Sequence, residues 1–100
     1  MEIKTEAKGD ALKISLSGRL DTIAAMDLEK QLQSSLDGVK ELTIDCDELA
    51  YIASSGLRSL LLAQKRMNKQ GKMTMINVGE TVSEVLEMTG FVEFLDIRKK

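Results

Sequence analysis

The hydrophobic period of this 100-residue chain changes repeatedly, and the order of the changes restricts the fold more than any other feature. Alternating apolar residues predict strands, and apolar residues spaced three and four apart predict amphipathic helices. Strands are expected at residues 2–7, 12–17, 42–47, 73–78 and 94–97, and helices around residues 25–36, 55–70 and 82–86. The predicted order is therefore β-β-α-β-α-β-α-β.

This order predicts a single α/β domain over residues 1–100 with a mixed sheet of four to five strands. The short turn at Gly9 makes the first two strands an antiparallel hairpin. Each later β-α-β unit requires parallel neighbours joined by a right-handed crossover. The polar alternate residues at 43–47 indicate that one face of the sheet is open, so we expect the helices mainly on the other face.

Polar and glycine residues mark the expected helix ends. Asp21 or Thr22 is a candidate N-cap of the first helix, since a short side-chain oxygen can accept from the free amides of the first turn. Gly38 is the expected C-cap of that helix. Thr81 and Glu84 have the spacing of a capping box at the start of the last helix.

The composition argues against several classes of function. The chain contains no His, the commonest general base and metal ligand, and its single cysteine, Cys46, excludes an intramolecular disulfide and a CxxC site. It also lacks the GxSxG and GxxxxGK[ST] motifs. We therefore expect no enzymatic activity, no metal and no cofactor. Cys46 is expected to be a small buried hydrophobic residue, and the six Met to fill the core.

Charge and hydropathy indicate where the chain acts. A net charge of −2 and only 3% aromatic residues argue against nucleic-acid binding. The longest apolar runs, such as residues 60–63, are far shorter than the roughly 20 residues of a membrane span. A disulfide-free chain fits a reducing compartment, so we expect a cytoplasmic protein that does not insert into membranes.

The junction before the second long helix contains two adjacent hydroxyl residues, Ser54 and Ser55, followed by Gly56. One interpretation is structural: either serine caps the helix, and Gly56 allows the backbone to turn closely. The other is functional, because the positive end of a helix tolerates a phosphate on such a serine. A phosphoserine there would add about −1.5 to −2 charges without unfolding the domain.

Three motifs in this order resemble the anti-sigma factor antagonists of the STAS-domain family. The stretch Ile52-Ala53-Ser54-Ser55-Gly56-Leu57 is similar to the family's Asp-Ser-Ser-Gly-Leu signature. Gly18-Arg19-Leu20-Asp21 resembles the family's Gly-x-Leu-Asp segment, and Thr89-Gly90-Phe91 resembles its Thr-Gly-hydrophobic turn. The resemblance covers nearly the whole chain.

This resemblance implies a phosphorylation switch. In the family, the first serine of the signature is phosphorylated by a partner that is both serine kinase and anti-sigma factor, and a phosphatase reverses the reaction. By position that serine is Ser54, with Ser55 in reserve, and the implied partner-binding residues are Asp21, Ala53, Ser54, Ser55, Gly56 and Arg58. Ala53 departs from the family's Asp, which keeps open an alternative: a non-phosphorylated adaptor subunit of a signalling or transporter complex.

Two further features have competing interpretations. Arg58 lies in the first turn of a helix, where a cation opposes the dipole, so it either is solvated or pairs with Asp21, with a phosphate or with an acidic partner. Asp45, Asp47 and Glu48 form an acidic group at the expected end of the third strand. They are interpreted as solvated charges; the alternative is a magnesium-dependent phospho-acceptor site.

Overall fold

The computed structural model describes all 100 residues and has the predicted order of elements. The hairpin strands are followed by three β-α units, and a short 3-10 helix, η1, precedes the last strand. The elements are β1 (Glu2–Lys8), β2 (Ala11–Leu20), α1 (Thr22–Ser35), β3 (Glu41–Ile52), α2 (Ser54–Gln70), β4 (Lys72–Val78), α3 (Glu80–Met88), η1 (Phe91–Glu93) and β5 (Ile97–Lys99).

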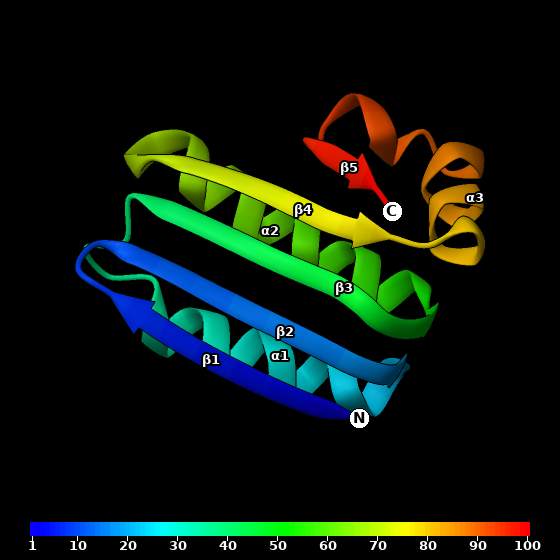
Figure 1. Cartoon of the computed structure of the whole chain (residues 1–100), viewed down its shortest axis with the longest axis horizontal. Coiled ribbons are helices and arrows are strands. Elements are labelled where there is room, and N and C mark those ends of the chain that lie inside the picture. The colour runs from blue at the N-terminus through cyan, green and yellow to red at the C-terminus, as the bar shows by residue number, and fades with distance from the viewer.

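The strands form one five-stranded mixed sheet in the order β1-β2-β3-β4-β5. Only β1 and β2 are antiparallel; the other neighbours are parallel, as right-handed crossovers require. Figure 1 shows α1 and α2 behind the sheet, with α3 at the end of the sheet where β3 and β4 finish. The other broad face carries no helix, which confirms the predicted open face.

The core lies between the sheet and the two long helices. Alternate strand residues such as Ile14, Ile44 and Met75 are fully buried there, and Leu28 and Leu60 meet them from α1 and α2. Cys46 belongs to the same core, and its burial raises the pKa of its thiol to about 12, so the thiol stays protonated at neutral pH. The prediction of a buried cysteine is confirmed.

The strand predictions needed three corrections. β2 continues to Leu20, three residues beyond its predicted end at residue 17. β3 continues to Ile52, beyond the predicted end at residue 47, because the alternation slips at an irregularity: its register against β2 shifts between Ser15 and Ser17. After this shift Leu49 returns to the core side, and a second shift between Gly18 and Arg19 brings Ile52 there as well. The last strand is Ile97–Lys99, since residues 91–93 form η1 instead of leading directly into a strand at residue 94.

Two helix ends also differ from the predictions. α1 ends at Ser35 with Leu36 as its C-cap, and Gly38 lies in the following turn at a left-handed φ of 77°. α3 begins one residue before Thr81, with Gly79 as the N-cap and no side-chain cap, so the predicted capping box does not form.

Methionine positions were only partly predicted. Met67, Met73 and Met75 fill the core, but Met88 is 87% exposed at the end of α3 and Met26 is 57% exposed on α1. No helix has the length and apolar character needed to cross a membrane.

Candidate functional site

The candidate site forms where β2 and β3 end side by side. Leu20 and Ile52 are paired in register, and the amide of Ala53 donates to the carbonyl of Leu20 at 2.9 Å. The chain enters α1 and α2 directly after these residues, so the two helix N-termini lie together. Ser55 Oγ donates to Thr22 Oγ1 across them at 3.4 Å. Asp21 and Ser54 therefore lie at the same end of the sheet.

The two helix N-termini are capped differently. Asp21 is the N-cap of α1, and its Oδ1 accepts from the amide of Ala24 at 2.9 Å, as predicted. The N-cap of α2 is Ala53, whose methyl group cannot accept a hydrogen bond. The expectation that Ser54 or Ser55 caps this helix is wrong, because both already lie inside its first turn. The first amides of α2 are left without a side-chain partner.

The two serines present their hydroxyls differently. Ser54 is exposed and its hydroxyl makes no hydrogen bond, whereas Ser55 is partly buried and its hydroxyl is bound to Thr22. Ser54 is thus the accessible nucleophilic oxygen at this helix end.

Gly56 allows α2 to pack closely on the ends of β2 and β3. A Cβ at this position would lie 2.7 Å from Cγ of Leu20 and 3.2 Å from Cγ1 of Ile52, both closer than ordinary van der Waals contact. Gly56 therefore lies within the helix and not in a turn before it, and the absence of a side chain lets the helix rest directly on the ends of β2 and β3.

Arg58 lies one turn after Ser54 on the same side of α2. It is exposed and makes no ion pair, so the suggested pairing with Asp21 does not form. Arg58 lines a hollow of about 210 Å³ between α1 and α2, together with Met26 and Ser55. Ser59 also links the two helices here, since its buried hydroxyl donates to the carbonyl oxygen of Ala25 at 3.4 Å.

Two large apolar side chains extend this region onto α1. Ile23 is 74% exposed and Met26 is 57% exposed. The sequence analysis did not single out Ile23 and placed Met26 in the core with the other methionines, although both fall off the apolar stripe of α1, on the side that an amphipathic helix normally keeps polar. We call the set Ile23, Met26, Ser54, Ser55 and Arg58 the α1–α2 surface.

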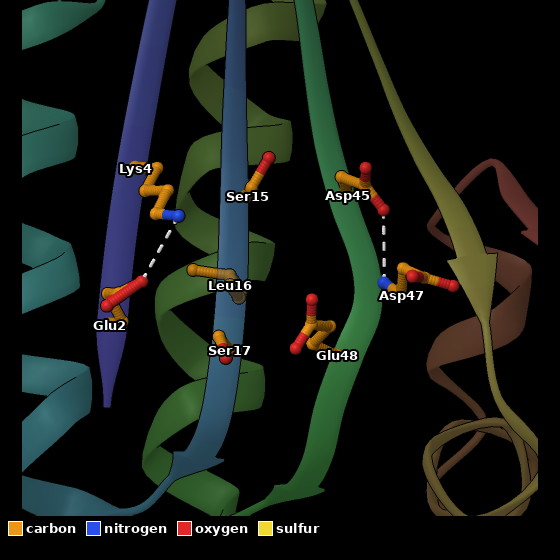
Figure 2. A pocket seen from close by; sticks show the side chains of 8 residues that line it. All are labelled: Glu2, Lys4, Ser15, Leu16, Ser17, Asp45, Asp47 and Glu48. Atoms are coloured by element: carbon orange, nitrogen blue, oxygen red, sulfur yellow. Dashed lines mark hydrogen bonds and ion pairs between the residues drawn. The ribbon is translucent and has the colours of Figure 1, made fainter.

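A second hollow, of about 320 Å³, lies on the open face of the sheet over β1, β2 and β3. Figure 2 shows the acidic side chains of β3 beside it, with Lys4 reaching toward Glu2 on β1. The acidic residues were predicted at the end of the third strand, but they lie within β3, which continues to Ile52. No group of three or more His, Cys, Asp or Glu side chains in the chain is arranged to hold a metal ion.

Asp45 has structural partners in this hollow. Burial raises the pKa of its carboxyl group, but hydrogen bonds from Asn77 and from the amide of Asp47, with the charge of Lys13, outweigh burial and lower the pKa overall. A carboxylate with a lowered pKa stabilises the fold above its ordinary pKa, and that contribution is lost as the pH falls through the lowered value. Asp45 therefore acts as an anchor between β2, β3 and β4.

Replacing Ala53 with aspartate is expected to raise the free energy of unfolding by about 1 kcal/mol, because a carboxylate at the N-cap would accept from the free amides of α2. The backbone of Ala53 already has the extended conformation that an N-cap needs, with φ −88° and ψ 167°. Urea denaturation measures the change, and Ala53→Leu is the control that adds bulk without an acceptor. Equal stabilisation by both variants would contradict the capping explanation.

Comparison with known proteins agrees with this architecture. The STAS domain family model matches residues 2–100. A Bordetella bronchiseptica protein named as the anti-sigma factor antagonist BtrV is 32% identical over 96 residues, which cover 93% of this chain and 83% of that protein. The anti-sigma-B factor antagonist of Staphylococcus aureus is 21% identical, with 99% of this chain and 94% of the relative covered.

Solved structures show the same fold. An anti-sigma factor antagonist from Mycobacterium paratuberculosis superposes with a TM-score of 0.88 at 20% identity, over 99% of this chain and 86% of the other. The unphosphorylated form of the anti-sigma factor antagonist SpoIIAA gives 0.78 at 16% identity, over 99% and 88%.

The fold defines a small mixed-sheet α/β domain with two exposed helix N-termini at one end of the sheet. The chain belongs to the STAS domain family.

Proposed function

We propose that this protein is an anti-sigma factor antagonist whose α1–α2 surface binds a kinase-type anti-sigma factor and so releases a sigma factor. Phosphorylation of Ser54 ends that binding, and a phosphatase restores it. The main support is the position of Ser54: an exposed hydroxyl without hydrogen bonds, on the first residue of a helix whose N-cap side chain is a methyl group.

The surface around Ser54 has the mixed character of a docking site. Ile23 and Met26 offer exposed apolar area, while Arg58 offers a cation without an intramolecular partner. Aromatic residues, Met and Arg are enriched in protein interfaces, and an unpaired arginine is suited to a carboxylate on the partner. The names of the relatives from Bordetella and Staphylococcus support the choice of partner class.

The direct experiment is to incubate the protein with candidate kinase-type anti-sigma factors, with and without ATP. The proposal expects a complex without ATP, and with ATP a mass increase of one phosphate that is absent from Ser54→Ala. A complex of equal stability in both conditions, with no mass increase, would contradict the switch.

That contrary result would favour the adaptor alternative, for which Ala53 is the specific observation. The missing acidic residue next to Ser54 removes one contact that a kinase of the family could use. In that case the same α1–α2 surface would hold the chain permanently within a larger signalling or transporter assembly. Ala53→Asp then gives a second test, because restored phosphorylation in this variant alone would identify residue 53 as the cause.

Reversing the charge of Arg58 (Arg58→Glu) is expected to weaken binding of the anti-sigma factor by about tenfold or more, since an attractive contact becomes repulsive in a partly desolvated interface. Stability should change little because Arg58 makes no ion pair. Calorimetric titration measures the affinity. Lys40→Glu is the matched control, because it makes the same charge change at an exposed position before β3, at the opposite end of the sheet.

An unchanged affinity in Arg58→Glu, or an equal loss in Lys40→Glu, would remove Arg58 from the interface. The first result would leave Ile23 and Met26 as the principal contacts; the second would indicate a general effect of net charge.

A further inference from the structure

We propose that the free edge of β1 is a self-association surface, on which β1 of a second copy of this chain pairs antiparallel, with Thr5 facing Thr5. This inference concerns a different face of the molecule from the α1–α2 surface, and the two share no residue.

β1 is a long edge that no other element of the chain covers. It is the outermost strand, pairs only with β2, and spans seven residues, of which all but Ile3 are exposed. Figure 1 shows no element beyond it on that side. The opposite edge, β5, spans only three residues. An exposed edge presents unpaired backbone groups that readily accept another strand, so a long edge such as β1 needs either protection or a partner.

The hairpin determines which backbone groups of β1 are free. Lys8 and Ala11 face each other across the two-residue turn, which makes them a hydrogen-bonded pair. Every second residue from Lys8 therefore directs its N–H and C=O toward β2. The groups of Ile3, Thr5 and Ala7 point away from the sheet, where they can bond to another strand.

The charges of β1 select one register for such pairing. Glu2, Lys4, Glu6 and Lys8 alternate in sign along the open face of the sheet. With Thr5 opposite Thr5, Glu2 faces Lys8 of the second copy and Lys4 faces Glu6, so every charged pair is attractive. These are the non-hydrogen-bonded positions, where facing side chains approach most closely.

The same register also pairs the outward backbone groups. Ile3 faces Ala7 of the second copy, and Thr5 faces Thr5, so each free N–H meets a free C=O. A shift of two residues in either direction places Lys4 opposite Lys4 or Glu6 opposite Glu6, which is repulsive. A shift of one residue places the charged residues of one copy opposite Ile3, Thr5 and Ala7 of the other, so that one sheet would have to turn its open face to the opposite side. The sequence is thus self-complementary in one full-length register.

The resulting dimer has a two-fold axis perpendicular to the sheet at Thr5. Because this rotation keeps each face on its own side, the two sheets continue into one another with α1 and α2 of both copies on the same face. In the monomer, Lys4 instead contacts Glu2 of its own strand at 3.4 Å, and both side chains are largely exposed, so Lys4 is free to change partner.

The test uses two charge variants of the full chain, Lys4→Glu and Glu6→Lys, and measures association by sedimentation velocity over a concentration series. We expect the wild type to dimerise, more weakly at high salt because the pairs are exposed. Each variant alone should self-associate at least about tenfold more weakly, since two facing pairs become repulsive. An equimolar mixture of the two variants should associate again, because every facing pair between them is attractive.

Thr5→Pro tests the backbone contribution. The Thr5 amide points away from β2, so proline there should remove edge pairing while the hairpin and the thermal unfolding temperature are retained. Lys69→Glu, an exposed charge change on α2, is the control that should associate like the wild type. A wild type that stays monomeric throughout the series overturns the proposal. So does a dimer that survives Thr5→Pro, or a mixture of charge variants that stays monomeric.

Discussion

Phosphorylation of Ser54 is expected to weaken the complex with the anti-sigma factor by about two to three orders of magnitude. The modification adds about −1.5 to −2 charges to the first residue of α2. A partner carboxylate about 4 Å away would then be repelled by about 4 kcal/mol per unit charge at an effective dielectric constant near 20, or about 1 kcal/mol in water. Repulsion energies between these two limits correspond to a loss of about two to three orders of magnitude in affinity.

The domain itself should keep its fold on phosphorylation. The first amides of α2 have no side-chain cap, and the positive end of the helix favours a phosphate. Titration calorimetry of the purified phosphorylated and unphosphorylated forms measures the affinity, and thermal unfolding followed by circular dichroism measures the stability. An unchanged affinity would contradict the charge switch, and a large drop in unfolding temperature would assign the effect to misfolding.

Two serine variants locate the acceptor. Ser54→Ala should abolish phosphate incorporation while changing the free energy of unfolding by less than about 0.5 kcal/mol, because its hydroxyl makes no hydrogen bond. Ser55→Ala is the matched control: it loses the contact with Thr22 but keeps the acceptor. The opposite pattern, with incorporation lost only in Ser55→Ala, would make Ser55 the phosphorylated residue.

The fold could be predicted from the sequence because its strands and helices have different apolar periods. Leu12, Ile14 and Leu16 alternate without interruption, and the start of β2 was accordingly predicted to within one residue, although the strand continues three residues past its predicted end, to Leu20. β3 was truncated because Asp47 and Glu48 are both exposed, which breaks the alternation where the register slips. A single sequence does not show a bulge, since the irregularity is defined by pairing with the neighbouring strand.

The place of Ser54 in the fold was predicted, but the structure of its helix end was not. The motif around Ser54 placed the exposed serine at the start of a helix, yet the cap was assigned to a serine when it is Ala53. Ser is favoured at N-caps, and propensity alone does not fix the residue at which a helix begins. Ile23 was not singled out and Met26 was expected in the core, because a surface shared by two helices depends on contacts between distant parts of the sequence.

Replacing Gly56 with alanine is expected to lower the free energy of unfolding by about 1–3 kcal/mol, because the added methyl group has no room. It would lie 2.7 Å from Cγ and 2.8 Å from Cδ2 of Leu20, a side chain that is itself completely buried. The unfolding temperature should fall by about 4–8 °C for each kcal/mol. Gly79→Ala is the control, since a Cβ there meets nothing within 4 Å, and it should change stability by less than about 0.5 kcal/mol.

A double-mutant cycle separates this collision from a general effect of alanine in α2. Leu20→Ala alone creates a cavity and should cost about 2–5 kcal/mol. If the methyl group added by Gly56→Ala collides with Leu20, the double variant Gly56→Ala/Leu20→Ala must lose less stability than the sum of the single variants, because each change relieves part of the other. Strictly additive losses would show that Gly56 is required for another reason. A favourable coupling would instead establish that the height of α2, and with it the position of Ser54, is set by direct packing of a glycine on the end of β2.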